Sequence, residues 1–185
     1  MSKNVLIISS SLRAGSNSEA LAHEVEKGTK DAGNEVEFIS LKGKDIHFCR
    51  GCLACQQTLK CVIKDDMSEM IKKVQNADIL VFVTPIYYYE MSGQLKTFLD
   101  RCNPLYSQEN KFKEVYLVTS SADGSEHASD MAVNGLQGWI SCFEQAEFAG
   151  LLAGGGLEAP NDASANEEFL NKAYNFGLSL GKRAG

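Results

Sequence analysis

The sequence has little of what marks a secreted, membrane-bound or nucleic-acid-binding protein. Its start, MSKNVLIISSS, has one Lys and only four strongly apolar residues together, so we expect no signal peptide. No stretch approaches the roughly 20 apolar residues that cross a bilayer. Acidic residues outnumber basic ones by 24 to 18, and the formal net charge of -6 would repel phosphate backbones. We therefore expect a cytoplasmic protein with reduced thiols that binds neither membranes nor nucleic acids.

Common nucleotide-binding motifs and domain boundaries are also missing. Neither the dinucleotide fingerprint Gly-x-Gly-x-x-Gly nor the Walker ending Gly-Lys-Ser/Thr occurs. The chain has no internal repeat, low-complexity tract or change of composition that would mark a linker. Because 185 residues can bury one sizeable core, residues 1–185 are expected to form a single domain, with a cysteine-rich loop at 45–65.

Short apolar runs alternate with segments of helical period. The runs at 4–9, 78–84 and 114–120 are typical of strands buried on both faces, 34–40 alternates like an edge strand, and 147–153 is a weaker fifth candidate. Helices are expected at 17–32, 66–76, 93–103, 128–146 and 163–183. This alternation predicts an α/β fold of the flavodoxin-like type, a three-layer sandwich. Its five-stranded parallel sheet would have the order 2-1-3-4-5 and carry helices on both faces.

Ligands of such sheets bind beyond the carboxyl ends of the strands. The expected ligand-binding loops are therefore those at 9–18, 41–65, 84–92, 119–127 and 153–162. The first, SSSLRAGSNSEA, opens a helix and is rich in hydroxyl groups. Hydroxyl donors and an Arg at a helix N-terminus suit a phosphate, although Ser16 or Asn17 could simply cap the helix. The candidate phosphate-binding residues are Ser9, Ser11, Arg13, Ser16, Asn17 and Ser18.

The sequence lacks the residues that other phosphate-binding proteins of this fold would need. A response regulator of this fold would need a carboxylate cluster at the strand ends, where Ser9 and Ser10 stand instead. A small phosphatase would carry a nucleophilic Cys leading into an Arg in this loop, but the first cysteine is Cys49. The monophosphate of FMN remains the best candidate.

Two further loops could border a flavin. In TPIYYYEMSGQLK, Pro85 is expected to end the strand, three tyrosines offer flat amphipathic surface, and Ser92 is a plausible helix cap. The tyrosines could equally pack in a core or a subunit interface. In TSSADGSEH, small residues would bring backbone N–H groups close to a ring edge, unless this is an ordinary polar turn. Its candidates are Ser120, Ser121, Asp123 and Gly124, and His127 is more readily a solvated loop residue.

Four of the six cysteines lie close together, in CRGCLACQQTLKC. Three cysteines at successive spacings of three resemble the loop that holds a cubane corner in bacterial ferredoxins, whereas zinc sites more often present two separated pairs. Free thiols, a zinc clip and a redox disulfide remain alternatives. Cys102 and Cys142 lie in helical patterns and receive no role.

The stretches SSSLRAGSNS, CRGCLACQQTLKCVIKDDM and TPIYYYEMSGQLKTFLDR resemble the flavodoxin-like NAD(P)H-dependent FMN reductase family, particularly its iron-sulfur flavoprotein branch. The likeness covers residues 3 to about 125. Ser10 stands where the phosphate loop of the family usually has Gly, while Ser11, Arg13, Gly15, Asn17 and Ser18 are kept. The resemblance implies that Pro85, Ile86, Tyr87 and Tyr88 border the isoalloxazine. It also implies that Cys49, Cys52, Cys55 and Cys61 hold one 4Fe-4S cluster.

We therefore predict an FMN-dependent oxidoreductase that passes electrons from NAD(P)H through FMN to an iron-sulfur centre or another acceptor. Hydride transfer needs no acid or base, so no catalytic residue is named. The acceptor would be a small molecule or a redox protein, and apolar surface near the cleft favours a homodimer or homotetramer. The alternatives are a cluster-free NAD(P)H:FMN, quinone or azo reductase, and a non-catalytic flavin or zinc module that senses redox state.

Overall fold

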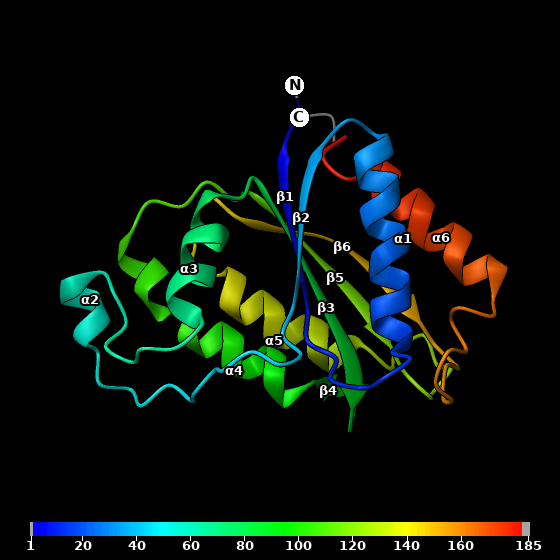
Figure 1. Cartoon of the computed structure of the whole chain (residues 1–185), viewed down its shortest axis with the longest axis horizontal. Coiled ribbons are helices and arrows are strands. Elements are labelled where there is room, and N and C mark those ends of the chain that lie inside the picture. The colour runs from blue at the N-terminus through cyan, green and yellow to red at the C-terminus, as the bar shows by residue number, and fades with distance from the viewer. Residues whose placement is uncertain (1, 183–185) are drawn as a thin grey trace.

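A parallel sheet lies between two layers of helices in the computed structural model, which describes residues 2–182 (Figure 1). The order of the parallel strands is β2-β1-β3-β5-β6, and a short sixth strand, β4, pairs antiparallel with β3. The strands are β1 (Asn4–Ser9), β2 (Glu35–Ser40), β3 (Ile79–Tyr87), β4 (Glu90–Met91), β5 (Glu114–Ser120) and β6 (Glu147–Gly154). The predicted flavodoxin-like order is confirmed, with β4 as an addition.

The helices divide between the two faces of this sheet. Successive residues of a strand point to opposite faces, so Val5 and Ile7 pack with α1 and α6, whereas Leu6 and Ile8 pack with α3, α4 and α5. Figure 1 shows these two groups of helices on either side of the strands. The helices are α1 (Asn17–Asp31), α2 (Ala54–Thr58), α3 (Met67–Asn76), α4 (Gly93–Arg101), the 3₁₀ helix η1 (Asn103–Ser107), α5 (Asp130–Ile140) and α6 (Glu167–Ser179).

Two glycines let α1 and α6 cross at very short range. A Cβ atom on Gly28 would lie 2.1 Å from the carbonyl oxygen of Tyr174, and one on Gly177 would lie 2.2 Å from that of Val25. Thr29 adds hydrogen bonds from Oγ1 to the carbonyl oxygens of Val25 and Gly177, at 2.7 and 3.3 Å. This close crossing fixes α6, and with it the loop between β6 and α6 that reaches the functional edge.

Several predicted boundaries differ from the structure. Helix α5 ends at Ile140 rather than at 146, because the chain then makes a series of turns that bring Phe143 against Phe112 in the core. Helix α6 covers only the middle of the segment predicted at 163–183, and residue 183 lies outside the described residues. Helix α4 ends two residues early, and η1 follows it with Pro104 in its first turn.

Candidate functional site

The carboxyl ends of the parallel strands bring the predicted loops to one edge of the sheet. Ser9 at the end of β1 is in register with Ser40 of β2 and Val83 of β3, and Ser120 at the end of β5 pairs with Gly154 of β6. The loops that follow β1, β3, β5 and β6 therefore meet at the lower edge in Figure 1, where α1 begins. This edge is where the fold places a ligand.

The first turn of α1 has the features of an anion site. Ser16 caps the helix, because its Oγ accepts a hydrogen bond from the backbone N–H of Glu19 at 3.2 Å. Within residues 2–182, no group accepts a hydrogen bond from the backbone N–H of Asn17 or Ser18. Ser11, Ser16 and Ser18 are all buried beside this turn. The turn therefore combines free N–H donors, hydroxyl groups and the positive end of the helix dipole.

The side chain of Asn17 is already engaged with the loop after β6. Its Nδ2 donates to the carbonyl oxygens of Leu157 and Ala159 at 3.2 and 2.8 Å, and its Oδ1 accepts from the backbone N–H of Ala163 at 3.1 Å. All of its hydrogen-bonding capacity except one lone pair is used there. Asn17 thus joins α1 to residues 157–163, a tie that the local sequence pattern did not indicate.

Two neighbours of Asn17 strengthen the same tie. Arg13 is exposed, and its Nη1 donates to the carbonyl oxygen of Glu158 at 3.0 Å. The carbonyl oxygen of Gly15 accepts from the backbone N–H of Asn161 at 2.9 Å. A Cβ atom on Gly15 would lie 2.7 Å from Oδ1 of Asn161, so only glycine fits at this position without displacing Asn161. The loop at 157–163 therefore closes over one side of the predicted phosphate loop.

Ser10, which replaces the usual glycine, is accommodated without backbone strain. Its φ is not among the positive values in the described chain, and its side chain is fully buried. Oγ donates to the carbonyl oxygen of Val83 at 2.9 Å and lies 2.9 Å from Oγ of Ser92, the cap of α4. Ser10 thus links the first loop to the base of the tyrosine loop. Its neighbour Ser9 has a buried Oγ without a hydrogen-bond partner inside residues 2–182.

The tyrosine segment forms a projecting hairpin, and Pro85 does not end the strand as predicted. Strand β3 runs through Pro85 to Tyr87, because the ladder with β1 has ended at Val83 and leaves one side of β3 without a strand partner, where proline is tolerated. Tyr88 and Tyr89 form the two-residue loop with φ of 51° and 64°, the sign that type I′ hairpins need. All three tyrosines are more than half exposed, so packing in the core of this chain is excluded.

The loop after β5 is held against the glycines after β6. Ser121 is buried, its backbone N–H donates to the carbonyl oxygen of Gly154, and its Oγ donates to the carbonyl oxygen of Asp123 at 2.7 Å. Gly124 packs against Gly155, whose added Cβ would lie 3.2 Å from the Cα of Gly124. His127 is exposed, and its Nδ1 lies 3.0 Å from Asp130. These contacts hold the loop at the edge of the sheet, and Ser120 is buried at its start.

The four clustered cysteines surround one small cavity at the far end of α4. Cys49 and Cys52 are exposed, Cys61 is half-buried and Cys55, in α2, is buried. Together with Arg101, Asn103 and Pro104 they line a cavity of about 20 Å³. In the described part of the chain, no three His, Cys, Asp or Glu side chains are placed to hold a metal ion. The four predicted ligands therefore share one cavity, but no three of them are placed around a single metal ion.

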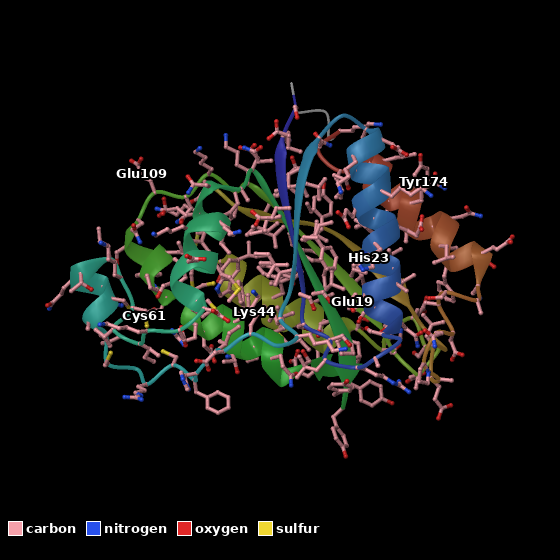
Figure 2. All side chains as sticks on the ribbon, viewed as in Figure 1. Glu19, His23, Lys44, Cys61, Glu109 and Tyr174 are labelled. Carbon is pink, nitrogen blue, oxygen red and sulfur yellow. The ribbon has the colours of Figure 1, made fainter. Side chains whose placement is uncertain are left out.

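The cysteine loop leaves the sheet at the expected edge, but the cysteines lie away from it. Helix α4 begins beside the tyrosine hairpin at Ser92 and ends at Arg101, which lines the cysteine cavity. Its nine residues span about 13 Å. Figure 2 shows Cys61 beside α2, well apart from Glu19 in the first turn of α1. The two predicted sites thus lie at opposite ends of α4.

A buried ion pair supports the cysteine cavity. The Asp65 and Arg101 side chains are fully buried and form two hydrogen bonds, of 2.5 and 2.9 Å. Burial alone would raise the pKa of Asp65, but the hydrogen bonds from Arg101 and from the backbone N–H groups of His47 and Met67 outweigh it and leave this pKa below its usual value. The hydrogen bond to Asp65 raises the pKa of Arg101, which stays charged.

Comparison with known proteins identifies the family. Residues 3–149 match the family described as NADPH-dependent FMN reductase. The chain belongs to this family. It is 31% identical to iron-sulfur flavoprotein MJ1083 of Methanocaldococcus jannaschii over 182 residues, which cover 95% of this chain and 94% of that protein. It is 27% identical to an iron-sulfur flavoprotein of Methanosarcina thermophila over 151 residues, 78% of this chain and 79% of the relative.

A solved structure supports the fold. The NAD(P)H:quinone oxidoreductase from Methanothermobacter marburgensis has a TM-score of 0.74 to this chain at 17% identity, and the match covers all of both chains. The predicted recognition of the FMN reductase family, in its iron-sulfur flavoprotein branch, is confirmed. At the level of the family, the chain is an oxidoreductase that uses FMN and NAD(P)H. No helix within residues 2–182 has the length and apolar character needed to span a membrane.

Three residues at the cysteine cavity were not predicted from the sequence. Asp65, Arg101 and Asn103 border the cysteine cavity or hold it in place, and none was a candidate. For Arg101 a signal existed: it lies three residues after Phe98, on the buried face of α4. For Asp65 and Asn103 the local pattern resembles an ordinary polar turn, so only the tertiary contacts distinguish them.

Proposed function

We propose that the chain acts as a single FMN-binding domain over residues 1–185, with the flavin phosphate at the first turn of α1. One observation carries this proposal: the N–H groups of Asn17 and Ser18 have no acceptor within residues 2–182 and lie beside a cluster of buried serines, at the carboxyl edge of the sheet. Ser9, Ser11, Ser16 and Ser18 supply hydroxyl groups, and Arg13 supplies the cation. Asn17 contributes through its backbone, since its side chain holds the loop at 157–163.

The isoalloxazine is proposed to lie between the tyrosine hairpin and the loop after β5. Pro85, Ile86, Tyr87 and Tyr88 border one side, and backbone groups of residues 120–124 border the other. The exposed rings of the hairpin and the rigid contacts of Ser121 support this arrangement. Bound FMN would accept a hydride from NAD(P)H and can release electrons singly. The chain holds the flavin and excludes water on one face, and no side chain has to donate or accept a proton in the hydride step.

Cys49, Cys52, Cys55 and Cys61 are proposed to hold a 4Fe-4S cluster that accepts single electrons. The donor set suits such a cluster, since four thiols line one cavity and the relatives in the M. jannaschii and M. thermophila genomes are named iron-sulfur flavoproteins. Cys49 and Cys52 are exposed on the 48–53 segment, which forms neither helix nor strand.

The oligomeric state and the acceptor are proposed from the surface. Large apolar side chains are exposed on the cysteine loop and on the hairpin: Phe48, Leu53, Leu59, Val62, Tyr87, Tyr88 and Tyr89. Such exposure supports a homodimer or homotetramer in which these loops are covered. Electrons would leave to a small molecule or a redox protein.

Anaerobic purification followed by quantification of FMN, iron, zinc and sulfide tests the proposal. We expect one FMN and four irons per chain, and oxidation of NADPH or NADH. In Cys52→Ala the cluster absorbance should disappear while FMN stays bound. Cys142→Ala is the matched control, because Cys142 is exposed and lies outside the cavity. Loss of flavin and iron together in Cys52→Ala would contradict two separate sites.

A cluster-free quinone or azo reductase is the second candidate. It is favoured because no three ligands within residues 2–182 are placed around one metal ion, and by the structural likeness to a quinone oxidoreductase. Flavin without iron, with quinone reduction by NAD(P)H, would establish it. Flavin or zinc without oxidation of either nicotinamide would instead favour a non-catalytic redox sensor.

A further inference from the structure

Two of the four clustered sulfurs receive N–H hydrogen bonds from the same corner of the fold. Nδ2 of Asn103 donates to Sγ of Cys55 at 3.0 Å, and Nη2 of Arg101 donates to Sγ of Cys61 at 3.5 Å. Both donors lie where α4 passes into η1. This corner is therefore in direct contact with half of the predicted ligand set.

The guanidinium of Arg101 is held rigidly in that contact. Its Nη1 donates to the carbonyl oxygen of His47 at 2.6 Å and to Asp65, while Nη2 donates to Asp65 and to Cys61. The side chain is fully buried, and Nε is without a partner inside residues 2–182. Because the Asp65 carboxylate fixes the planar fork, the donor toward Cys61 has one orientation.

The other two cysteines have no such support. Cys49 and Cys52 are exposed, and residues 44–53 form neither helix nor strand. No described side chain donates a hydrogen bond to either sulfur. Within the described residues, side-chain N–H groups therefore hold one half of the site, Cys55 and Cys61, and not the other half, Cys49 and Cys52.

Hydrogen bonds to the sulfurs of a cluster have a known physical effect. Reduction adds negative charge to the cluster and its thiolates, and an N–H dipole or a cation beside a sulfur stabilises that charge. Such donors raise the reduction potential. A charged donor in a buried position has the stronger effect because solvent screens it little.

We propose that Arg101 and Asn103 are positioning residues of the cysteine site, which hold Cys61 and Cys55 as preformed ligands and raise the reduction potential of the iron-sulfur cluster bound there. This inference rests on the cluster in the proposed function. It assigns to the α4–η1 corner the role of setting how readily the cluster accepts an electron from the flavin at the other end of α4.

Redox titration of the anaerobically purified holoprotein tests the inference, with the cluster followed by its electron paramagnetic resonance signal and FMN by its visible bands. Asn103→Leu removes one donor at similar volume. Arg101→Lys keeps the charge beside Asp65 but lacks the fork that reaches Asp65, His47 and Cys61 together. These variants avoid leaving Asp65 buried without a cation, which could prevent folding.

Two controls match the test variants. Asn76→Leu makes the same change at an exposed side chain that bonds only the carbonyl oxygen of Lys72. Lys96→Met removes a positive charge from the exposed face of α4, where Lys96 pairs with Asp100. The FMN potential in each variant is an internal control, because α4 separates the two sites.

We expect Asn103→Leu and Arg101→Lys each to shift the cluster potential downward, the double variant to shift it further, and the FMN potential and both controls to keep wild-type values. Cluster potentials equal to wild type at full iron content would overturn the inference and leave the proposed function intact. A wild-type protein that carries FMN but no iron would refute the cluster itself, and this inference with it.

Discussion

The tie made by Asn17 allows a quantitative prediction. Asn17→Ala removes three hydrogen bonds to backbone groups of residues 157–163, at a side chain that is only 5% exposed. A buried hydrogen bond contributes about 1 kcal/mol net, so the free energy of unfolding should fall by about 3 kcal/mol. That is a large share of the roughly 5–15 kcal/mol typical of a folded domain.

Urea denaturation of the flavin-free protein measures this loss. With an m value of about 2 kcal/mol/M, the midpoint should fall by about 1.5 M. Asn171→Ala is the matched control, since Asn171 is an exposed residue of α6 without a hydrogen-bonded side chain in the described structure, and its midpoint should stay within about 0.3 M of wild type. A fall of less than about 0.5 M in Asn17→Ala would refute the reasoning, because the three bonds would then contribute almost nothing.

Three further predictions concern the hairpin, the helix crossing and the buried ion pair. Replacing Tyr88-Tyr89 by Asn-Gly should raise the free energy of unfolding by about 1–2 kcal/mol, because Asn and Gly adopt positive φ more readily than Tyr. The same change should weaken FMN binding in a fluorescence titration. Tighter FMN binding would show that the two tyrosines are not part of the site. Gly28→Ala should lower the free energy of unfolding by about 1–3 kcal/mol, because the added methyl group would overpack the helix crossing. Gly138 has open space around it, so the control Gly138→Ala should raise the free energy of unfolding by about 0.5–1 kcal/mol. Equal effects of the two changes in calorimetry would contradict the close crossing. Because the pKa of Asp65 is lowered in the folded protein, the ionised carboxylate stabilises the fold above about pH 4, and this contribution is lost as the pH falls further. Between about pH 6 and 3, the free energy of unfolding should therefore fall more in the wild type than in Asp65→Asn. Equal falls in urea titrations at acid pH would refute this.

The strands of the sheet could be predicted because the apolar pattern that marks each strand lies within the strand itself. β1, β3 and β5 are buried on both faces, so their residues form continuous apolar runs, and β2 alternates because it lies at the edge. The predicted end of α5 was wrong because apolar residues such as Phe143 continue beyond Ile140. These residues reach the core from turns instead of from a helix. A helical period does not distinguish these two routes.

The phosphate loop shows both the strength and the limit of sequence interpretation. The cap by Ser16 is local, and the sequence offered Ser16 as one of two possible caps because hydroxyl side chains are preferred at this position. The bonds of Asn17 and Arg13 reach residues about 140 positions away, and nothing in the local pattern indicates them. Pro85 was expected to end β3 for a local reason, but the early end of the β1 ladder made the proline compatible with a longer strand.

The cysteine loop is the part in which spacing was most informative and least sufficient. Four cysteines at short intervals predicted a common site, and all four line one cavity. Their spacing did not reveal that the cavity is supported by Asp65, Arg101 and Asn103, because these three residues lie outside the cysteine pattern and reach the cavity through tertiary contacts. The contribution of this corner follows from burial and contact geometry alone.

Parallel titration with FMN and with riboflavin, which lacks the phosphate, tests the central claim most directly. If the free N–H groups at the first turn of α1 and Arg13 hold the phosphate, one FMN should bind per chain, and riboflavin should bind at least about a hundredfold more weakly, as expected for the loss of two charge-assisted hydrogen bonds. Equal affinity for the two flavins would contradict phosphate recognition by this loop, and absence of binding to both would contradict the flavin site as a whole.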